Sequence, residues 1–278
     1  MNYSFLVATD MDYTLLMPGT PVSDRNREAC EAISKAGGAF TLSTGRTSFL
    51  TGAYTLDLNI TVPIITSNGA SVFDPVTRKE VYSSLIPQNI TRKLIEKFFE
   101  NNSNATGYSP EAIYFLPGSK RRQFIYDYNS NLPEEYKAPL GELTPDILNE
   151  KIPEFNKFLL IEPDEETLNY ARSIEELGIV SSAGGFYDIM AKGISKGSGL
   201  YKVADMLGIP HDLTFALGDS ENDLSMIEAA KYGVAMQNSD KRVLDAASYI
   251  TTTCEEDGFA KAIFEYILPK VKSLQSGL

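Results

Sequence analysis

Two aspartates stand one residue apart in the stretch DMDYTLL, residues 10–16, directly after the apolar run FLVAT. Alternation along an extended chain lets Asp10 and Asp12 face the same neighbourhood. Two more aspartates, Asp219 and Asp223, lie in GDSENDLSM near the other end of the chain. If the fold brings the four carboxylates together, their like charges must either raise a pKa or bind a cation.

The type of ligand indicates which cation this would be. Four carboxylates form an all-oxygen set, which suits magnesium better than zinc, and magnesium commonly bridges carboxylates to a substrate phosphate. The only histidine, His211, cannot build a histidine-rich zinc site. We therefore expect Mg²⁺ as the cofactor and His211 as a loop residue without a catalytic role.

Phosphoryl chemistry at such a site would also need a nucleophile, an acid and a further positive charge. A carboxylate can attack phosphorus to give an aspartyl-phosphate, and a neighbouring carboxyl that holds a proton can donate it to the leaving oxygen. Lys196, in GISKGSGL at the start of a predicted helix, can neutralise both phosphate and nucleophile. Thr44, in LSTGR, offers a hydroxyl group and a backbone N–H before Gly45.

The elements around these residues follow an alternating strand and helix pattern. Continuous apolar runs predict parallel strands that are covered on both faces. These strands are expected over residues 3–9, 39–43, 63–67, 214–219, 232–236 and, more weakly, 248–252. Helices are expected after the cap residue Ser23, stopping at Gly37, and over residues 195–207, 220–230 and 258–268. The pattern predicts a doubly wound parallel sheet with right-handed crossovers.

The predicted site residues fall where such a sheet binds ligands. Ligands of open α/β sheets lie beyond the carboxyl ends of the strands. Asp10 and Asp12 follow the first strand, and Asp219 closes the strand TFALGD. Thr44 and Asn68 follow the second and third strands. The sequence therefore predicts one convergent site at this edge.

The middle of the chain has a different character. Residues 84–188 are richer in aromatics and in alternating stretches such as RRQFIYDYN and FYDIMA, with helical patterns near 89–101 and 165–176. KRRQ, residues 120–123, is expected to be a solvated strand or turn, or else a second site for an anionic substrate. We predict an α/β core of residues 1–83 and 189–278 that carries an inserted α+β cap of residues 84–188.

Four motifs in order resemble those of a known family. DMDYTLL, LSTGR, SKG and GDSENDLSM are similar to the four motifs of the haloacid dehalogenase-like superfamily. Their spacing and the inserted middle resemble the Cof-type phosphatases, which have a type-IIB α/β cap. The resemblance implies a Mg²⁺-dependent hydrolase of small phosphorylated metabolites, sugar phosphates among them, that works through a phospho-aspartate.

The resemblance also implies roles for the residues that match the motifs. Asp10 would be the nucleophile and give one oxygen to Mg²⁺. Asp12 would be the general acid and then the base that activates water, with its backbone carbonyl on the metal. Thr44 and Lys196 would bind the phosphoryl group, and Asp219 would be a direct metal ligand.

Further positions match the family less closely. Asp223 would orient the metal shell, Asn222 would touch phosphate or Lys196, and Asn68 would lie near the substrate. Arg46 could be either a salt-bridging loop residue or a cation that orients substrate. The family usually has glycine where this chain has Tyr13, a departure that bears on the pocket entrance and on the choice of leaving group.

Composition limits the partners and the compartment. The net charge of −12 argues against non-specific binding to nucleic acid or to an anionic membrane. We expect neither a signal peptide nor a transmembrane helix, because residues 1–8 lack a basic region and a long apolar run, and two isolated cysteines cannot form a disulfide framework. We expect a cytoplasmic monomer or weak homodimer.

Two rival functions use the same residues. A phosphomutase of the same superfamily would return the phosphoryl group to a sugar. A phospho-acceptor signalling module would also combine acids, threonine and lysine around Mg²⁺, but such modules have no inserted cap. The spacing of Asp10 and Asp12 and the predicted second domain favour turnover.

Overall fold

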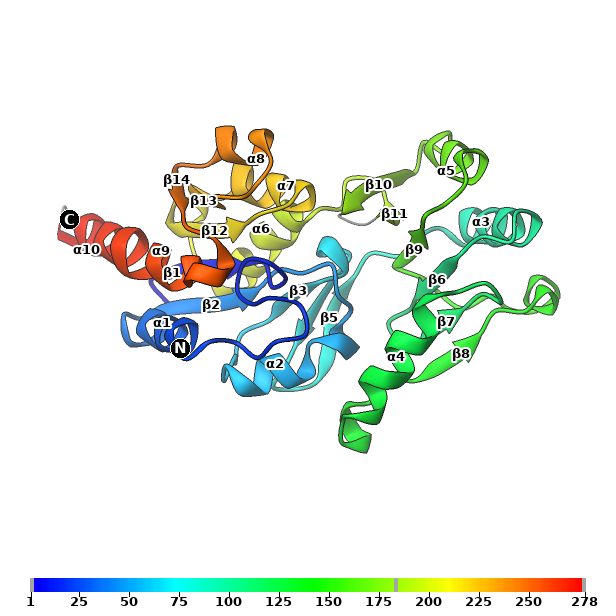
Figure 1. Cartoon of the computed structure of the whole chain (residues 1–278), viewed down its shortest axis with the longest axis horizontal. Coiled ribbons are helices and arrows are strands. Elements are labelled where there is room, and N and C mark those ends of the chain that lie inside the picture. The colour runs from blue at the N-terminus through cyan, green and yellow to red at the C-terminus, as the bar shows by residue number, and fades with distance from the viewer. Residues whose placement is uncertain (1–2, 183–184, 277–278) are drawn as a thin grey trace.

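The computed structural model describes residues 3–182 and 185–276, which build a core and a cap (Figure 1). The two ends of the chain, blue and yellow to red in Figure 1, form the core together. The green middle of the chain forms the cap, which lies to one side of the core. The predicted parallel-sheet core with an inserted α+β cap is confirmed.

A parallel sheet forms the centre of the core. Among the described residues it has five strands, in the order β14-β13-β12-β1-β2. Their bounds are β1 Phe5–Thr9, β2 Gly38–Leu42, β12 Thr214–Gly218, β13 Tyr232–Met236 and β14 Tyr249–Thr251. Thr9 is in register with Leu42 on one side and with Leu217 on the other. The carboxyl ends of β1, β2 and β12 therefore meet at one edge.

The core also contains the helices α1 Asp24–Lys35, α2 Gly52–Asp57, α6 Lys196–Leu207, α7 Glu221–Ala229, α8 Lys241–Ala246, α9 Gly258–Ala262 and α10 Leu268–Ser276. Of these, α1, α6, α7 and α9 lie close to their predicted positions, while α2, α8 and α10 were not predicted. The hydroxyl of Ser23 caps α1 by accepting from the backbone N–H of Asn26 at 3.1 Å. Gly37 ends this helix with a positive φ of 79°. The last helix was expected to stop at residue 268, but a π-helical turn over Ile263–Ile267 continues it into α10.

The third predicted strand differs from the others in its pairing. β3 Ile64–Thr66 pairs antiparallel with β4 Ser71–Asp74, which in turn pairs with β5 Lys79–Ser83. One parallel bridge, between Ser43 and Ile65, joins this sheet to the end of β2. The chain reverses after β3 because residues 67–69 all adopt positive φ angles.

The cap is a second sheet with helices. Within the described residues its six strands follow the order β10-β11-β9-β6-β7-β8. The strands are β6 Ala105–Tyr108, β7 Ile113–Phe115, β8 Leu140–Glu142, β9 Lys157–Ile161, β10 Leu177–Ser182 and β11 Phe186–Ala191, and the helices are α3 Gln88–Glu100, α4 Arg121–Ser130 and α5 Glu165–Arg172. The sheet continues through β11 to Ala191, three residues beyond the cap limit expected at 188. The domain limits stay predictions.

One sequence expectation in the cap is wrong. The sequence predicts an alternating stretch for RRQFIYDYN and a solvated strand or turn for KRRQ; Lys120 does lie in an exposed turn, but Arg121 begins the helix α4. Phe124, Tyr126 and Tyr128 alternate along the sequence, which imitates a strand. The buried residues are Ile125 and Asn129, four positions apart, which is the spacing of one helix face.

The helices are also informative about membranes. Among the described residues, none has both the length and the apolar character needed to span a bilayer. The longest core and cap helices instead bury one face each, as α3 does with Ile90, Leu94 and Phe98.

Candidate active site

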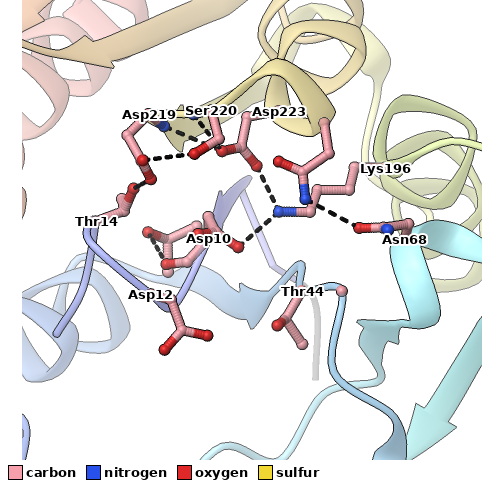
Figure 2. A network of polar contacts seen from close by, with 12 residues as sticks. Asp10, Asp12, Thr14, Thr44, Asn68, Lys196, Asp219, Ser220 and Asp223 are labelled. Carbon is pink, nitrogen blue, oxygen red and sulfur yellow. Dashed lines mark hydrogen bonds and ion pairs between the residues drawn. The ribbon is translucent and has the colours of Figure 1, made fainter. Parts of the chain in front are cut away.

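Three carboxylates gather at the carboxyl edge of the core sheet (Figure 2). Asp10 follows β1 directly, Asp219 follows β12, and Asp223 lies in the first turn of α7. One oxygen from each lies within 4.8 Å of the others, and all three side chains are buried. Residues that are about 210 positions apart in the chain therefore share one small volume.

Lys196 joins two of these carboxylates. Its Nζ lies 2.6 Å from Oδ1 of Asp10 and 2.5 Å from Oδ1 of Asp223, and the residue is only 1% exposed. Lys196 is the first residue of α6, whose cap residue Ser195 accepts from the backbone N–H of Ser198. A Cβ on Gly69 would lie 2.0 Å from the carbonyl oxygen of Ser195, so only glycine lets the turn after β3 hold this helix start in place.

Asp223 also organises the loop that carries Asp219. Its Oδ2 accepts from the backbone N–H groups of Asp219 and Ser220, each at 3.0 Å. Ser220 and Asp223 together form a capping box at the start of α7. A Cβ on Gly218 would lie 2.4 Å from the Cβ of Asp223, so glycine is required where the side chain folds back. The predicted cap at Ser220 is confirmed.

Two hydroxyl groups hold the carboxylate of Asp219. Thr14 donates to Oδ1 and Ser220 donates to Oδ2, both at 2.7 Å. Figure 2 shows Thr14 on the side of Asp219 away from Lys196, and Ser220 between Asp219 and Asp223. The sequence analysis gave Thr14 no role, although its place as the last residue of the DxDxT pattern was the available signal.

Burial and neighbouring charges shift the pKa values of the residues in this cluster. Burial raises the pKa of Asp10 well above its usual range, Lys196 opposes this, and Asp223 and Asp219 add to it. Burial and the nearby Asp223 likewise raise the pKa of Asp219. Burial acts to lower the pKa of Lys196, but Asp10 and Asp223 outweigh it and the net pKa is raised. The site therefore holds a lysine cation and still favours additional positive charge.

The residues present fit a magnesium ion. Asp10, Asp219 and Asp223 offer carboxylate oxygens only, which is the donor type that magnesium prefers. The excess of buried carboxylates over the one lysine is the condition in which a cation relieves repulsion. His211 lies outside the site, where its Nε2 is 2.8 Å from Asp205 on the protein surface.

The side chain of Asp12 lies apart from this cluster. Figure 2 shows its carboxylate directed away from those of Asp219 and Asp223. The carboxylate of Asp12 lines the same cavity as Asp10 but is not part of the group formed by Asp10, Asp219 and Asp223. The contact of its backbone carbonyl with a metal stays a prediction.

Arg46 binds the carboxylate of Asp12 through one edge of its guanidinium group. Its Nε is 2.9 Å from Oδ2 and its Nη2 is 2.5 Å from Oδ1. Burial acts to lower the pKa of Arg46, and the hydrogen bonds and charge of Asp12 raise it overall. Arg46 was expected to be either a salt-bridging loop residue or a cation that orients substrate, and the structure shows the salt bridge. It fixes the orientation of the acid that the DxDxT pattern supplies.

Thr44 and Gly45 follow β2 and face the same cavity. Thr44 is buried, and its Oγ1 accepts from the backbone N–H of Arg46 at 3.1 Å. The carbonyl oxygen of Gly45 accepts from Nζ of Lys157, in the cap, at 2.7 Å. The loop LSTGR is thereby held both by the core and by the cap.

Asn68 and Asn222 form a polar chain beside Lys196. Asn222 donates to Oδ1 of Asn68 at 3.2 Å, and Asn68 donates to Oδ2 of Asp188 in the cap at 2.7 Å. Lys157 closes the chain with its Nζ 2.9 Å from Oδ1 of Asp188. The roles of Asn68 and Asn222 toward phosphate stay predictions.

Sequence reasoning missed the two cap residues, Lys157 and Asp188. Both are almost fully buried and both contact the core. The available signal was a charged residue inside an otherwise apolar strand, in KFLLI and FYDIM. Buried charges of this kind are rarely found unless they are paired.

The chain is similar to known proteins over most of its length. A family profile described as haloacid dehalogenase-like hydrolase matches residues 7–263. The 5-amino-6-(5-phospho-D-ribitylamino)uracil phosphatase YcsE of Bacillus subtilis is 31% identical, with 95% of this chain and 96% of that protein covered. The pyridoxal phosphate phosphatase YbhA of Escherichia coli is 27% identical over 95% of this chain and 98% of its own.

Solved structures agree with these sequence matches. The sugar phosphatase BT4131, of haloacid dehalogenase subclass IIB, superposes with a TM-score of 0.80 at 25% identity. That alignment covers 95% of this chain and 99% of the other chain. The similarity therefore extends over core and cap together.

Proposed function

The chain belongs to the haloacid dehalogenase-like hydrolases, and on that premise we propose that it is a magnesium-dependent phosphatase of small phosphorylated metabolites. The observation that carries the proposal is the contact of Lys196 with both Asp10 and Asp223, beside a cluster of three buried carboxylates. A lysine in this position neutralises a nucleophilic carboxylate and an incoming phosphoryl group at once. Relatives over the full length are phosphatases by name, which supports phosphoric monoester hydrolysis.

In the proposed reaction, the carboxylate of Asp10 attacks phosphorus. The bond from phosphorus to the leaving oxygen breaks, and Asp12 gives that oxygen its proton. Asp12 then takes a proton from water, whose oxygen attacks the phosphorus and releases phosphate and Asp10. Mg²⁺, held by Asp10, Asp219 and Asp223, would balance the charge of the phosphoryl oxygens.

Arg46 and the residues near Lys196 have positioning roles in this scheme. The bidentate contact of Arg46 keeps Asp12 in one orientation through both steps. Thr44 offers its hydroxyl group and Asn222 its amide to the phosphoryl oxygens. Lys196 stays charged throughout because Asp10 and Asp223 raise its pKa.

The cavity above the site indicates a small substrate. It has a volume of about 430 Å³ and is lined by core residues, such as Asp10 and Thr44, and by cap residues, such as Tyr108 and Lys157. This volume is within the range of pockets for small molecules. A sugar phosphate fits the proposal, since one structural relative is named a sugar phosphatase. The cap also distinguishes this chain from phospho-acceptor modules.

The proposal is tested by phosphate release from a panel of phosphorylated metabolites with Mg²⁺. We expect the wild type to release inorganic phosphate from at least one ester without isomerising it, which also separates a phosphatase from a phosphomutase. Asp10→Asn should lower the rate by at least about 10⁴-fold, as loss of a nucleophile does. A thermal unfolding midpoint close to that of the wild type will show that the variant is folded. Near-normal release by Asp10→Asn would refute the assignment.

A further inference from the structure

The cavity above the site has two chemically different walls. The core supplies Asp10, Asp12, Arg46 and the loop around Thr44. The cap supplies an aromatic and cationic wall, which consists of Tyr108, Arg121, Phe124, Lys157, Leu159 and Phe186. A phosphomonoester seated with its phosphoryl group at Asp10 would direct its leaving group toward the cap.

Most charges that line this cavity are already paired. Asp12 pairs with Arg46, Asp188 pairs with Lys157, and Asp10 pairs with Lys196 beneath the floor. Within the described residues, Arg121 is the cation of the lining for which no acidic partner is present. The cap therefore presents one uncompensated positive charge to the substrate.

Aromatic rings hold this guanidinium group. Its Cζ lies 3.8 Å from the ring centroid of Phe124 and 6.0 Å from that of Phe186. Its Nε is buried and makes no hydrogen bond to any residue that the structure describes. Stacking on ring faces fixes the plane of a guanidinium group and leaves its N–H edge for an oxyanion.

The neighbouring arginine provides the contrast. Arg122 is bound through its guanidinium to both oxygens of Glu142, and its Cζ lies 4.9 Å from the ring centroid of Phe115. It does not appear among the residues that line the cavity. The two arginines are adjacent in sequence and have the same charge, yet only Arg121 faces the substrate space with donors free.

We propose that Arg121 binds a second oxyanion on the leaving group, so that the preferred substrates carry a carboxylate or another phosphoryl group besides the ester that is cleaved. The inference rests on the proposed phosphatase function and names its substrate class. Carboxylate and phosphate share the geometry that a guanidinium fork binds with two hydrogen bonds. Phe124 and Phe186 flank the guanidinium group that would make this contact.

Three phosphate esters with the same six-carbon chain test the proposal. Glucose 6-phosphate has a neutral leaving group, 6-phosphogluconate adds a carboxylate at the far end, and glucose 1,6-bisphosphate adds a phosphoryl group. The wild type should prefer at least one of the anionic esters by about tenfold in kcat/KM, the gain expected of a charged hydrogen bond. The anionic ester with the higher kcat/KM identifies whether Arg121 binds a carboxylate or a phosphoryl group.

Variants at the two arginines assign that preference. In Arg121→Gln the ratio of anionic to neutral kcat/KM should fall to within about twofold of one, and Arg121→Lys, which retains charge without the fork, should give an intermediate ratio. Arg122→Gln should keep the wild-type ratio. Equal rates for all three esters in the wild type, or a preference that survives in both Arg121 variants, would overturn the proposal.

A binding measurement separates this proposal from the phosphatase function. Calorimetric titration of the folded Asp10→Asn protein with each ester and Mg²⁺ reports the same preference without turnover. If the wild type releases no phosphate from any ester, the proposed function fails. The Arg121 site is still supported if Asp10→Asn binds the anionic esters more tightly than the neutral one and the double variant Asp10→Asn/Arg121→Gln does not. Equal binding of the three esters contradicts it.

Discussion

The core and cap walls of the cavity handle charge in opposite ways. In the core, Lys196, Asp10, Asp219 and Asp223 are buried and connected by short contacts. In the cap, Arg121 is stacked on aromatic rings and lacks an acidic partner among the described residues. Because these charged groups are buried and bound to one another, their positions relative to each other are fixed. The single cation without an acidic partner is where we propose that the leaving group is selected, while the reaction itself depends on the core.

The comparison predicts that damage to the core network affects stability and activity together. Lys196→Met leaves Asp10 and Asp223 buried without their cation, which should lower the free energy of unfolding by about 3–5 kcal/mol and kcat/KM by at least about 10³-fold. Denaturant unfolding and phosphate release will measure the two effects. Lys192→Met is the matched control, because Lys192 pairs with Glu175 on the surface and should show no measurable change in either. A stable, active Lys196→Met protein would contradict the role of the network.

A weaker effect is expected where a residue only positions the acid. Arg46→Gln removes the two contacts that orient Asp12 and should lower kcat/KM, which reports the step that expels the leaving group, about 10- to 100-fold for alkyl phosphates. The loss should be much smaller for 4-nitrophenyl phosphate, whose leaving group needs no proton. Rates with the two classes of ester will decide the point. Equal losses for both would show that Arg46 acts on the phosphoryl group directly.

The raised pKa values in the core predict how magnesium binding depends on pH. Asp10 and Asp219 bind protons more tightly in the folded protein, so their ionisation lowers stability as pH rises through those raised values. Mg²⁺ competes with the same protons. Its stabilisation, about 2.7 kcal/mol at a concentration of 100 Kd, should therefore be larger at pH 7.5 than at pH 5.

Thermal unfolding with and without Mg²⁺ at both pH values will test this dependence. Asp219→Asn should reduce the stabilisation at both. A shift in the unfolding midpoint that is equal at the two pH values, or unchanged in Asp219→Asn, would place the ion elsewhere.

The smallest effect is expected at the rim between core and cap. Tyr13 has a positive φ of 65°, and its side chain is 43% exposed and lines the cavity. Tyr13→Gly should relieve the strain and raise the free energy of unfolding by up to about 1 kcal/mol. KM for esters with large leaving groups should change while KM for small ones does not. Destabilisation by more than this amount would show that the tyrosine ring contributes packing instead.

The sequence was informative where structure is determined locally. Asp10, Asp219 and Lys196 lie at strand ends and at a helix start, and the apolar runs and cap residues around them mark those positions. Parallel strands bring such ends to one edge in any doubly wound sheet. The proximity of Asp10, Asp219 and Lys196 could therefore be predicted from the strand and helix pattern alone.

Contacts between core and cap could not be predicted from the sequence in this way. Lys157 and Asp188 reach Gly45 and Asn68 only because the cap docks on the core, and no local pattern records docking. Asp12 is bound by Arg46, which lies 34 residues away in the chain, and this pairing is likewise not recorded in the local sequence. In α4, alternating aromatic residues imitated a strand, while the buried pair four residues apart determined the helix.

The central claim is that Asp10 becomes phosphorylated, and the most direct measurement is identification of that adduct. Asp12→Asn is mixed with 4-nitrophenyl phosphate and Mg²⁺, quenched in acid within its first turnover and digested for mass spectrometry. Without the base that activates water, the protein should accumulate one phosphoryl group on the peptide that contains Asp10. A phosphoryl group on any other residue, or none while nitrophenol is released in a burst, would contradict the account.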